Sequence, residues 1–562
     1  MKISSMIFIS IIAFLCSGTV KHTNKSIKDC SGLNKKSVLR SLDEYQFNYN
    51  DGADARKFRK VDILHYDLSF DLHPDKKMFY ASAEIKGIVK DKESETIDLN
   101  FYDNYKIESV TLDGDNTEYF NKGKNFSVKL KEPVIDTFLL KIDYSGTPEK
   151  AGFVGFDFGE NKGTSLVYNL SEPNYASSWF PCNDSPSDKA LLDMRIENDS
   201  SQVSVSNGIL VDVIDHDARR TYHWKTVYPI STYLIAIYSS NYSHFSDSYI
   251  SLNKQDTMSI DYYVLPTDLE NAKLDFKQHP DMIRFFSETF GEYPFIKEKY
   301  GIAEFFWELG AMEHQTITGL ASNMIGGKGY FLDVLVHELA HHWWGDAVGP
   351  KYWKDIWLNE GFATYSEALF YEFRSGKSAL QSTMLNKKQR NFRGSLENPG
   401  NFLFTSTVYD KGAWVLHMLR WELGDRTFFE ILRKYFEKYK YSNASTVDFE
   451  NVCESVSNKD LTKFFDQWIK AVGEIELKYN WNVEEGSSGN FITNISLHQD
   501  QKEYDEYHFS LEIALKFENG KSEIHKVKFS KKSIEVSFKS SSEPVDVILD
   551  PNNWLLMYAE KE

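Results

Sequence analysis

Residues 336–346 read VHELAHHWWGD, so three histidines and one glutamate fall within an otherwise apolar segment. On an α-helix of about 3.6 residues per turn, His337 and His341 lie roughly 40° apart around the axis, so both imidazoles can reach one ion. Glu338 lies beside that face, whereas His342 is rotated by roughly 140° from His337, as expected for a surface or supporting histidine. The pattern indicates a zinc-binding helix with Glu338 as a general base.

Two histidines do not complete a catalytic zinc site, which has three protein ligands and an open position for water. The segment WKDIWLNEGFATYSEAL, residues 353–369, predicts a second amphipathic helix in which Glu360 lies near the start. Two histidines and one carboxylate are a known catalytic zinc shell. We therefore expect His337, His341 and Glu360 to bind one Zn²⁺ per chain.

Eighteen residues separate His341 from Glu360, and this spacing resembles that of the gluzincin aminopeptidases, the family of aminopeptidase N and leukotriene hydrolase. The family's usual HELAHQWFGD is matched except at His342 and Trp344. The segment WFPCNDSPSDKA, residues 179–190, is similar to the FPCxDEPxxKA of the family's N-terminal β domain. The resemblance extends from about residue 60 to the end of the chain.

The resemblance also implies catalytic roles. Glu338 would take a proton from zinc-activated water and pass it to the leaving amine. The segment VYDKGAWVLHML matches the one that carries the family's catalytic tyrosine, which is Tyr409 here. Its hydroxyl would stabilise the oxyanion together with zinc.

Substrate-binding residues follow from the motif GAMEH, which resembles the family's exopeptidase motif GAMEN. Glu313 would pair with a free α-ammonium, so that only the first peptide bond lies over the metal. Glu172, eight residues before Phe180, would be a second amine-binding acid. His314 replaces the family's asparagine, which can alter the motif or make substrate binding depend on pH near 6 to 7. The main chain of the motif would hydrogen-bond an extended peptide like an added strand, through Gly310, Ala311 and Met312.

These residues predict a zinc metalloaminopeptidase, a hydrolase that removes N-terminal residues from peptides with a free amine. A peptide-binding relative without turnover is disfavoured, since the ligands, the base and the tyrosine are all present. An epoxide hydrolase of the leukotriene hydrolase type is disfavoured because its C-terminal helical domain cannot be located. Glu313 disfavours a thermolysin-like endopeptidase.

Apolar periodicity predicts a multidomain α+β protein. Alternation, as in HYDLSFDL, predicts an N-terminal antiparallel β domain over residues 56–255. The period becomes helical over residues 256–477, where the resemblance implies a thermolysin-like, mainly α-helical catalytic domain. Alternation returns in residues 478–562 and predicts a C-terminal β-sandwich. The chain would therefore be a short family member without the C-terminal helical domain.

Individual helices can be placed in the helical region. The segment YDKGAWVLHMLRWELGD has apolar residues on one face and ends at Gly424, which suits a helix C-cap. Further helices are expected at residues 279–290, 331–344, 360–374 and 425–439.

The N-terminal sequence predicts export. Residues 6–15 are apolar, about half of a bilayer span, and small residues follow, which is typical of a signal peptide over residues 1–18. Cys16 is a candidate lipid anchor, although Leu15 is a poor match to the small residue usually found before a lipidated cysteine. Residues 19–55 form a polar, lysine-rich leader or tether. We expect a secreted, periplasmic or cell-surface protein, with or without that anchor.

Composition restricts the partners. The 41% hydrophobic and 26% charged residues describe an ordinary globular protein with no transmembrane segment beyond the signal peptide. The net charge of -18 disfavours nucleic acid, which requires a basic surface. Cys30, Cys182 and Cys453 are odd in number and widely spaced, so no disulfide framework is expected.

Overall fold

The computed structural model describes residues 60–91, 93–130, 137–161, 163–400, 402–486 and 489–562. The chain divides into two compact units, one of Met1–Trp353 with Phe436–Ser445 and one of Lys354–Tyr435 with Thr446–Glu562. We describe each unit by itself. Among the described residues, no helix combines the length and the apolar character needed to cross a bilayer.

Some expectations from the sequence fall outside the described residues. These are the signal peptide over residues 1–18, the leader over residues 19–55, and the thiols of Cys16 and Cys30. Cys182 and Cys453 are described, and both are buried free cysteines.

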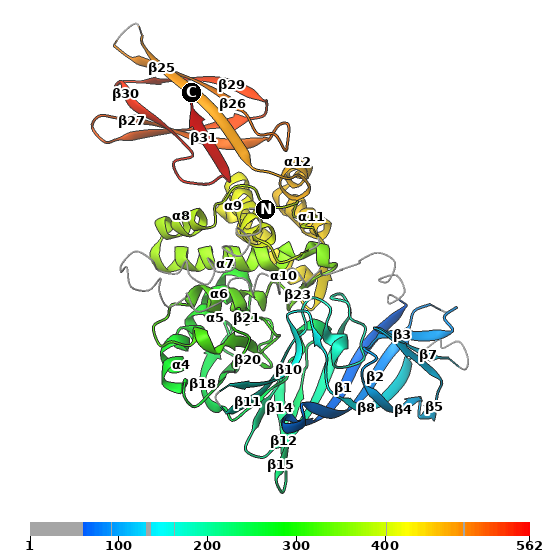
Figure 1. The fold of residues 1–562 in the computed structure, drawn as a ribbon. Coiled ribbons are helices and arrows are strands. Elements are labelled where there is room, and N and C mark those ends of the chain that lie inside the picture. The colour runs from blue at the N-terminus through cyan, green and yellow to red at the C-terminus, as the bar shows by residue number, and fades with distance from the viewer. Residues whose placement is uncertain (1–59, 92, 131–136, 162, 401, 487–488) are drawn as a thin grey trace, which may run out of the picture. The chain divides into compact units, whose positions relative to one another are not determined.

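The first unit begins with a nine-stranded sheet in the order β14-β15-β12-β1-β2-β8-β4-β5, with β16 paired to β12 (Figure 1). Most neighbouring strands are antiparallel, as predicted, but β1 and β12 pair in parallel, with Tyr66 opposite Leu192. The strands are β1 (Val61–His73), β2 (Met78–Val89), β4 (Lys106–Leu112), β5 (Asp115–Asn116), β8 (Thr137–Gly146), β12 (Lys189–Asp199), β14 (Ile209–His216), β15 (Arg219–Lys225) and β16 (Ile230–Ser231).

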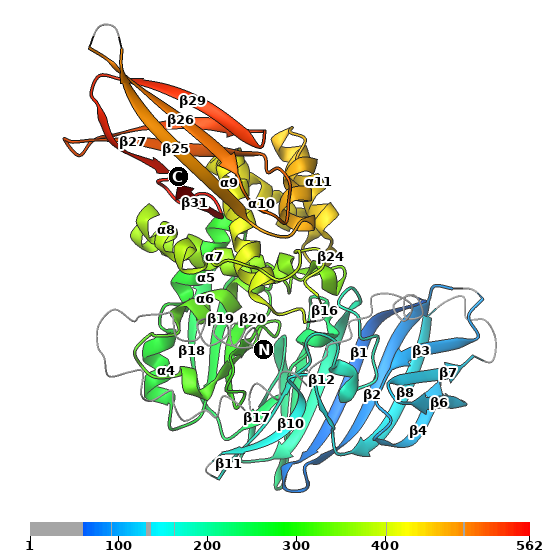
Figure 2. The same ribbon diagram turned by 45° about the horizontal axis from the view of Figure 1, so that its top comes forward.

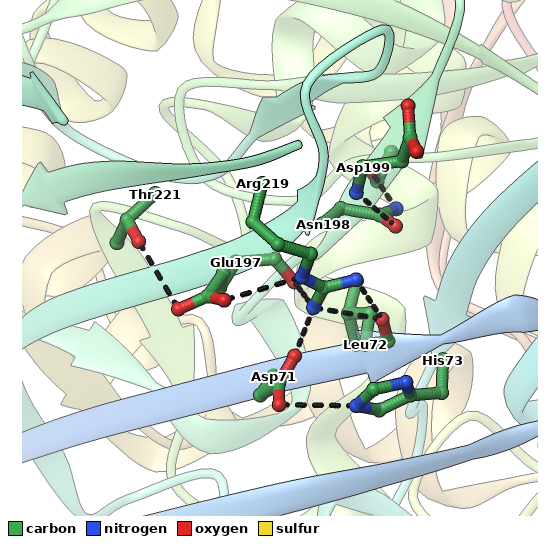
Figure 3. Close-up of polar contacts among 9 residues, drawn as sticks. Asp71, Leu72, His73, Glu197, Asn198, Asp199, Arg219 and Thr221 are labelled. Carbon is green, nitrogen blue, oxygen red and sulfur yellow. Dashed lines mark hydrogen bonds and ion pairs between the residues drawn. The ribbon is translucent and has the colours of Figure 1, made fainter. Parts of the chain in front are cut away.

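This sheet has one apolar and one charged face, which explains the alternation in its sequence. Tyr66, Leu68, Phe70 and Leu72 of β1 are buried. On the other face, Arg219 donates to the carbonyl oxygen of Leu72 at 3.1 Å and forms ion pairs with Glu197 and Asp71 (Figure 3). His73 pairs with the same Asp71 at 3.0 Å. Such partly exposed pairs contribute little stability individually.

Smaller sheets complete the first unit. A five-stranded sheet has the order β13-β17-β11-β10-β9, and a three-stranded sheet has the order β3-β7-β6. Their strands are β3 (Thr96–Asn100), β6 (Tyr119–Lys122), β7 (Asn125–Lys129), β9 (Lys150–Ala151), β10 (Val154–Asn161), β11 (Thr164–Leu170), β13 (Val203–Val205) and β17 (Tyr238–Ser240).

A second five-stranded sheet, in the order β18-β19-β20-β22-β21, lies in the part that carries the zinc motif. Helices accompany it (Figure 2). The elements are β18 (Ser243–Ile250), β19 (Thr257–Val264), β20 (Lys299–Phe305), β21 (Ala311–Met312), β22 (Thr318–Ala321), α4 (Leu269–Phe276), α5 (His279–Phe290) and α6 (Leu332–His341). A short pair, β23 (Val348–Pro350) and β24 (Ser442–Ala444), closes the unit.

The second unit contains most remaining helices and a β-sandwich (Figure 2). The helices are α7 (Trp357–Ser375), α8 (Lys377–Asn386), α9 (Gly412–Leu423), α10 (Asp425–Tyr439), α11 (Thr446–Ser457) and α12 (Thr462–Phe465), with π-turns η7 (Thr407–Lys411) and η8 (Asp466–Lys470). The last residues of α10 belong to the first unit. The two sheets of the sandwich have the orders β29-β26-β25-β31 and β28-β27-β30. Their strands are β25 (Ile475–Glu485), β26 (Phe491–Gln499), β27 (Phe509–Phe517), β28 (Ser522–Phe529), β29 (Ser533–Ser540), β30 (Pro544–Leu549) and β31 (Met557–Lys561).

The helix predictions are confirmed for α5 and α10, and α9 ends at the predicted Gly424 cap. Two boundaries were wrong. The helix expected at 331–344 ends at His341, because the chain turns there and the N–H of Asp346 donates to the His341 carbonyl at 3.0 Å. The helix expected from residue 360 begins at Trp357, so Glu360 lies within its first turn.

Candidate active site

The two predicted histidine ligands lie on the buried side of α6. His337 and His341 are 3% and 1% exposed, and one ring nitrogen of each lies within 4.8 Å of the other. His341 Nδ1 is 3.0 Å from the carbonyl oxygen of Trp344, so Nδ1 carries the proton and donates it. Nε2 of His341 therefore has the lone pair that a metal requires. The pair fits a metal such as zinc.

Glu338 is also buried, at 7% exposure, and its charge acts on neighbouring tyrosines. Burial raises the pKa of Tyr238 well above its usual range, and the negative charges of Glu338 and Glu313 add to this effect. Burial and the Glu338 charge likewise raise the pKa of Tyr300. Both hydroxyls therefore stay protonated in a region where carboxylates gather.

Lys189 supports the turn after α6. It is the lysine of the segment that resembles the FPCxDEPxxKA motif, and the sequence did not indicate its role. Its Nζ donates to the carbonyl oxygens of Asp346 at 2.5 Å and Ala347 at 3.1 Å. Burial lowers the pKa of this amine to about 7. Lys189 is the first residue of β12, so it connects this strand to the turn after α6. The same turn orients His341 through the Trp344 carbonyl oxygen.

His342 is a supporting histidine rather than a surface one. Its side chain is fully buried, and Nδ1 shares a hydrogen bond of 2.9 Å with the Tyr293 hydroxyl. Nδ1 also lies 3.8 Å from the carboxylate of Asp346. Burial lowers the pKa of His342 well below its usual value, so the ring packs as a neutral group.

Two acids predicted to bind an amine come together in the first unit. Glu313 follows β21 and is 4% exposed, and Glu172 is 7% exposed. One carboxylate oxygen of each lies within 4.8 Å of the other. Two buried carboxylates this close repel one another, so a cation bound between them would be favourable. Glu172 thus lies close to Glu313.

The main chain of the GAMEH motif forms β21, which lies at the edge of its sheet within the described chain. Ala311 pairs with Leu320 and Met312 with Gly319 on one side. The carbonyl oxygen of Gly310 accepts from the N–H of Ala321 at 3.2 Å. An edge strand can accept an extended peptide as a further strand.

His314 does not titrate where the sequence suggested. The ring is fully buried, and burial lowers its pKa to about 3. The expected pH dependence near 6 to 7 is therefore wrong for His314 itself, because the folded protein keeps the ring neutral there.

The second unit holds Glu360 and Tyr409. Glu360 is 3% exposed in the first turn of α7, and Tyr409 is half-buried in the π-turn η7. Helix α7 is in backbone contact with η7 and with the start of α9, since a Cβ built on Gly361 would lie 3.2 Å from the Val408 carbonyl oxygen and 2.9 Å from Cα of Gly412. This contact explains why glycine follows Glu360.

Replacing Gly361 with alanine is expected to destabilise the protein by about 1 to 3 kcal/mol, because backbone atoms of Gly412 occupy the space of the new methyl group. Denaturant unfolding measures the change. Gly326→Ala is the control, since nothing lies within 4 Å of a Cβ at that position. Equal stability of the two variants would contradict the close crossing of α7 with η7 and α9.

Comparison with known proteins identifies the family. The Peptidase M1 N-terminal domain matches residues 63–234, and the Peptidase family M1 domain matches residues 274–468. The chain belongs to peptidase family M1.

Relatives agree with this assignment. Aminopeptidase N of Lactococcus lactis subsp. lactis is 27% identical over 73% of this chain and 51% of its own length. Aminopeptidase 2, mitochondrial, of Saccharomyces cerevisiae is 27% identical over 73% of this chain and 46% of its own. The chain thus spans about half the length of these relatives.

Solved structures share the fold. The M1 zinc metallopeptidase of Deinococcus radiodurans has a TM-score of 0.66 at 23% identity, covering 73% of this chain and 94% of its own. Legionella pneumophila aminopeptidase A, in complex with aspartic acid, has a TM-score of 0.78 at 18% identity, covering 90% of this chain and 60% of its own. The N-terminal β-rich part, the helical part and the C-terminal β-rich part therefore follow the M1 fold.

Proposed function

We propose that the chain is an exported zinc aminopeptidase. The observation that carries this proposal is the buried pair of Glu172 and Glu313, in the same unit as the buried histidines of α6. Family membership and the names of the relatives support it. Export rests on the sequence of residues 1–18 alone.

His337, His341 and Glu360 would hold the zinc, one ion per chain. The two imidazoles and one carboxylate are the donor set of a catalytic zinc site. Bound there, zinc would polarise the scissile carbonyl and lower the pKa of water. The eighteen-residue spacing to Glu360 supports its inclusion as the third ligand.

Glu338 would accept the proton of the attacking water and donate it to the leaving amine. The Tyr409 hydroxyl would donate a hydrogen bond to the oxygen that gains negative charge. Losing one such donor typically costs about 2.7 to 4 kcal/mol of barrier.

Glu313 and Glu172 would bind the α-ammonium of the peptide and so select the first peptide bond. A blocked N-terminus would bring no positive charge to these two carboxylates. The edge of β21, through Gly310, Ala311 and Met312, would hydrogen-bond the peptide main chain.

The proposal is tested with aminoacyl arylamides and their N-acetylated counterparts, with and without a chelator. We expect cleavage of the free-amine substrates alone, lost on chelation and restored by zinc. Glu313→Gln should lower kcat/KM for the free-amine substrate by about 10²- to 10⁴-fold, as expected from losing a buried charge partner worth about 3 to 5 kcal/mol. Chelator-insensitive cleavage, or none on any residue, would reject the aminopeptidase. Internal fragments from an N-blocked peptide would instead favour an endopeptidase.

A further inference from the structure

The turn that follows Glu313, residues 314–317, is tied to the N-terminal β-rich part of the first unit. Tyr238 in β17 shares a hydrogen bond of 2.5 Å with Nδ1 of His314. Both side chains are fully buried. The N–H of Ile317 donates to the His314 carbonyl at 2.9 Å and closes the turn. Tyr238 therefore holds the first residue after Glu313.

Two further hydrogen bonds hold the same turn. Nδ2 of Asn207 donates to the carbonyl oxygen of Gln315 at 2.6 Å. The N–H of Gly208 donates to Oγ1 of Thr316 at 2.9 Å. Thr316 has a φ of 67°, in the left-handed region that β-branched residues rarely adopt. Such a conformation persists only where the surroundings hold it.

Tyr238 reaches the turn across β22. A Cβ built on Gly319 would lie 2.3 Å from the Tyr238 hydroxyl, so only glycine leaves room for it. Gly319 pairs with Met312, the residue before Glu313. The tyrosine is thus packed against β22 at the residue that pairs with Met312 of β21.

The hydrogen-bonded pair of Tyr238 and His314 adds no positive charge beside Glu313. Burial lowers the pKa of His314 to about 3, so the ring is neutral at physiological pH. A protonated histidine there would compete with a substrate ammonium for the Glu313 carboxylate. A neutral histidine that is hydrogen-bonded to a tyrosine supports the turn without competing with the substrate ammonium.

We propose that Tyr238, Asn207 and Gly208 form a clamp that positions Glu313 for recognition of the peptide N-terminus. The three are positioning residues, because they act through the 314–317 turn. The inference rests on the proposed aminopeptidase function and adds the residues that set its selectivity for a free amine.

The test compares Tyr238→Phe with Tyr242→Phe. Each variant loses one buried hydroxyl, but that of Tyr242 donates to the Glu304 carbonyl at 2.6 Å, away from the turn. For Tyr238→Phe we expect KM for an aminoacyl arylamide to rise about 5- to 100-fold, with kcat within about threefold and zinc content unchanged. The kcat/KM for the free-amine substrate should fall by the same factor. Tyr242→Phe should leave KM and kcat/KM for the free-amine substrate unchanged.

Thr316→Val provides a second variant, which removes the acceptor of the Gly208 N–H. It should also raise KM. If Tyr238→Phe does not fold, Thr316→Val alone tests the proposed clamp. An unchanged KM in the folded variants, or an equal rise of KM in Tyr242→Phe, would contradict the proposed clamp. A wild-type enzyme without any preference for free amines would reject the proposed function instead.

Discussion

Glu338→Gln is expected to lower kcat by about 10²- to 10⁴-fold, the usual contribution of general acid–base catalysis. Glutamine has nearly the same shape but cannot accept the proton of the attacking water. Glu338 is not among the proposed ligands, so the variant should still bind one zinc per chain.

Steady-state kinetics and metal analysis on the same samples measure this effect. Glu304→Gln is the matched control, since Glu304 is also buried and accepts from the N–H of Leu265 at 2.7 Å. It should change kcat by less than about threefold. A Glu338→Gln enzyme that keeps kcat within tenfold of wild type, with full zinc, would remove Glu338 from the mechanism.

Glu360→Gln is expected to weaken zinc binding by about 10²- to 10³-fold. Structural zinc sites bind with about 10 to 16 kcal/mol over four ligands, so one ligand contributes about 2.5 to 4 kcal/mol. Competition with a chromophoric chelator measures the affinity. The control is Glu367→Gln on the same helix, where the buried Glu367 pairs with Lys387 at 2.7 Å. A loss in Glu367→Gln equal to that in Glu360→Gln would mean that helix stability, rather than ligation, sets the affinity.

The elements of the fold could be predicted from local patterns. Alternation in β1 reflects a sheet with one buried face, and the helical period predicted α5 and α10 with their bounds. Pairing could not be predicted in this way. The parallel contact of β1 with β12 joins residues more than 120 positions apart, and no local pattern indicates its direction.

The candidate site was predictable where its residues are close in sequence. His337, Glu338 and His341 share one helical turn, so their arrangement follows from helix geometry. The location of Glu172 beside Glu313 depends on long-range folding, and it was only implied by resemblance. The roles of Lys189 and Tyr238 depend on partners more than 70 residues away, so the sequence did not indicate them.

The neutrality of His314 depends on burial in the folded chain. An exposed histidine titrates near pH 6.5, and the sequence alone does not reveal that His314 is fully enclosed. The end of α6 at His341 is similar, because the turn there is stabilised by hydrogen bonds from the Lys189 amine.

X-ray diffraction from crystals of the zinc-loaded protein, with data above and below the zinc absorption edge, tests the central claim most directly. We predict one anomalous peak at about 2.0 to 2.2 Å from a nitrogen of His337, a nitrogen of His341 and an oxygen of Glu360. A peak bound to the histidines but distant from Glu360, or no peak at these residues, would contradict the proposed metal site.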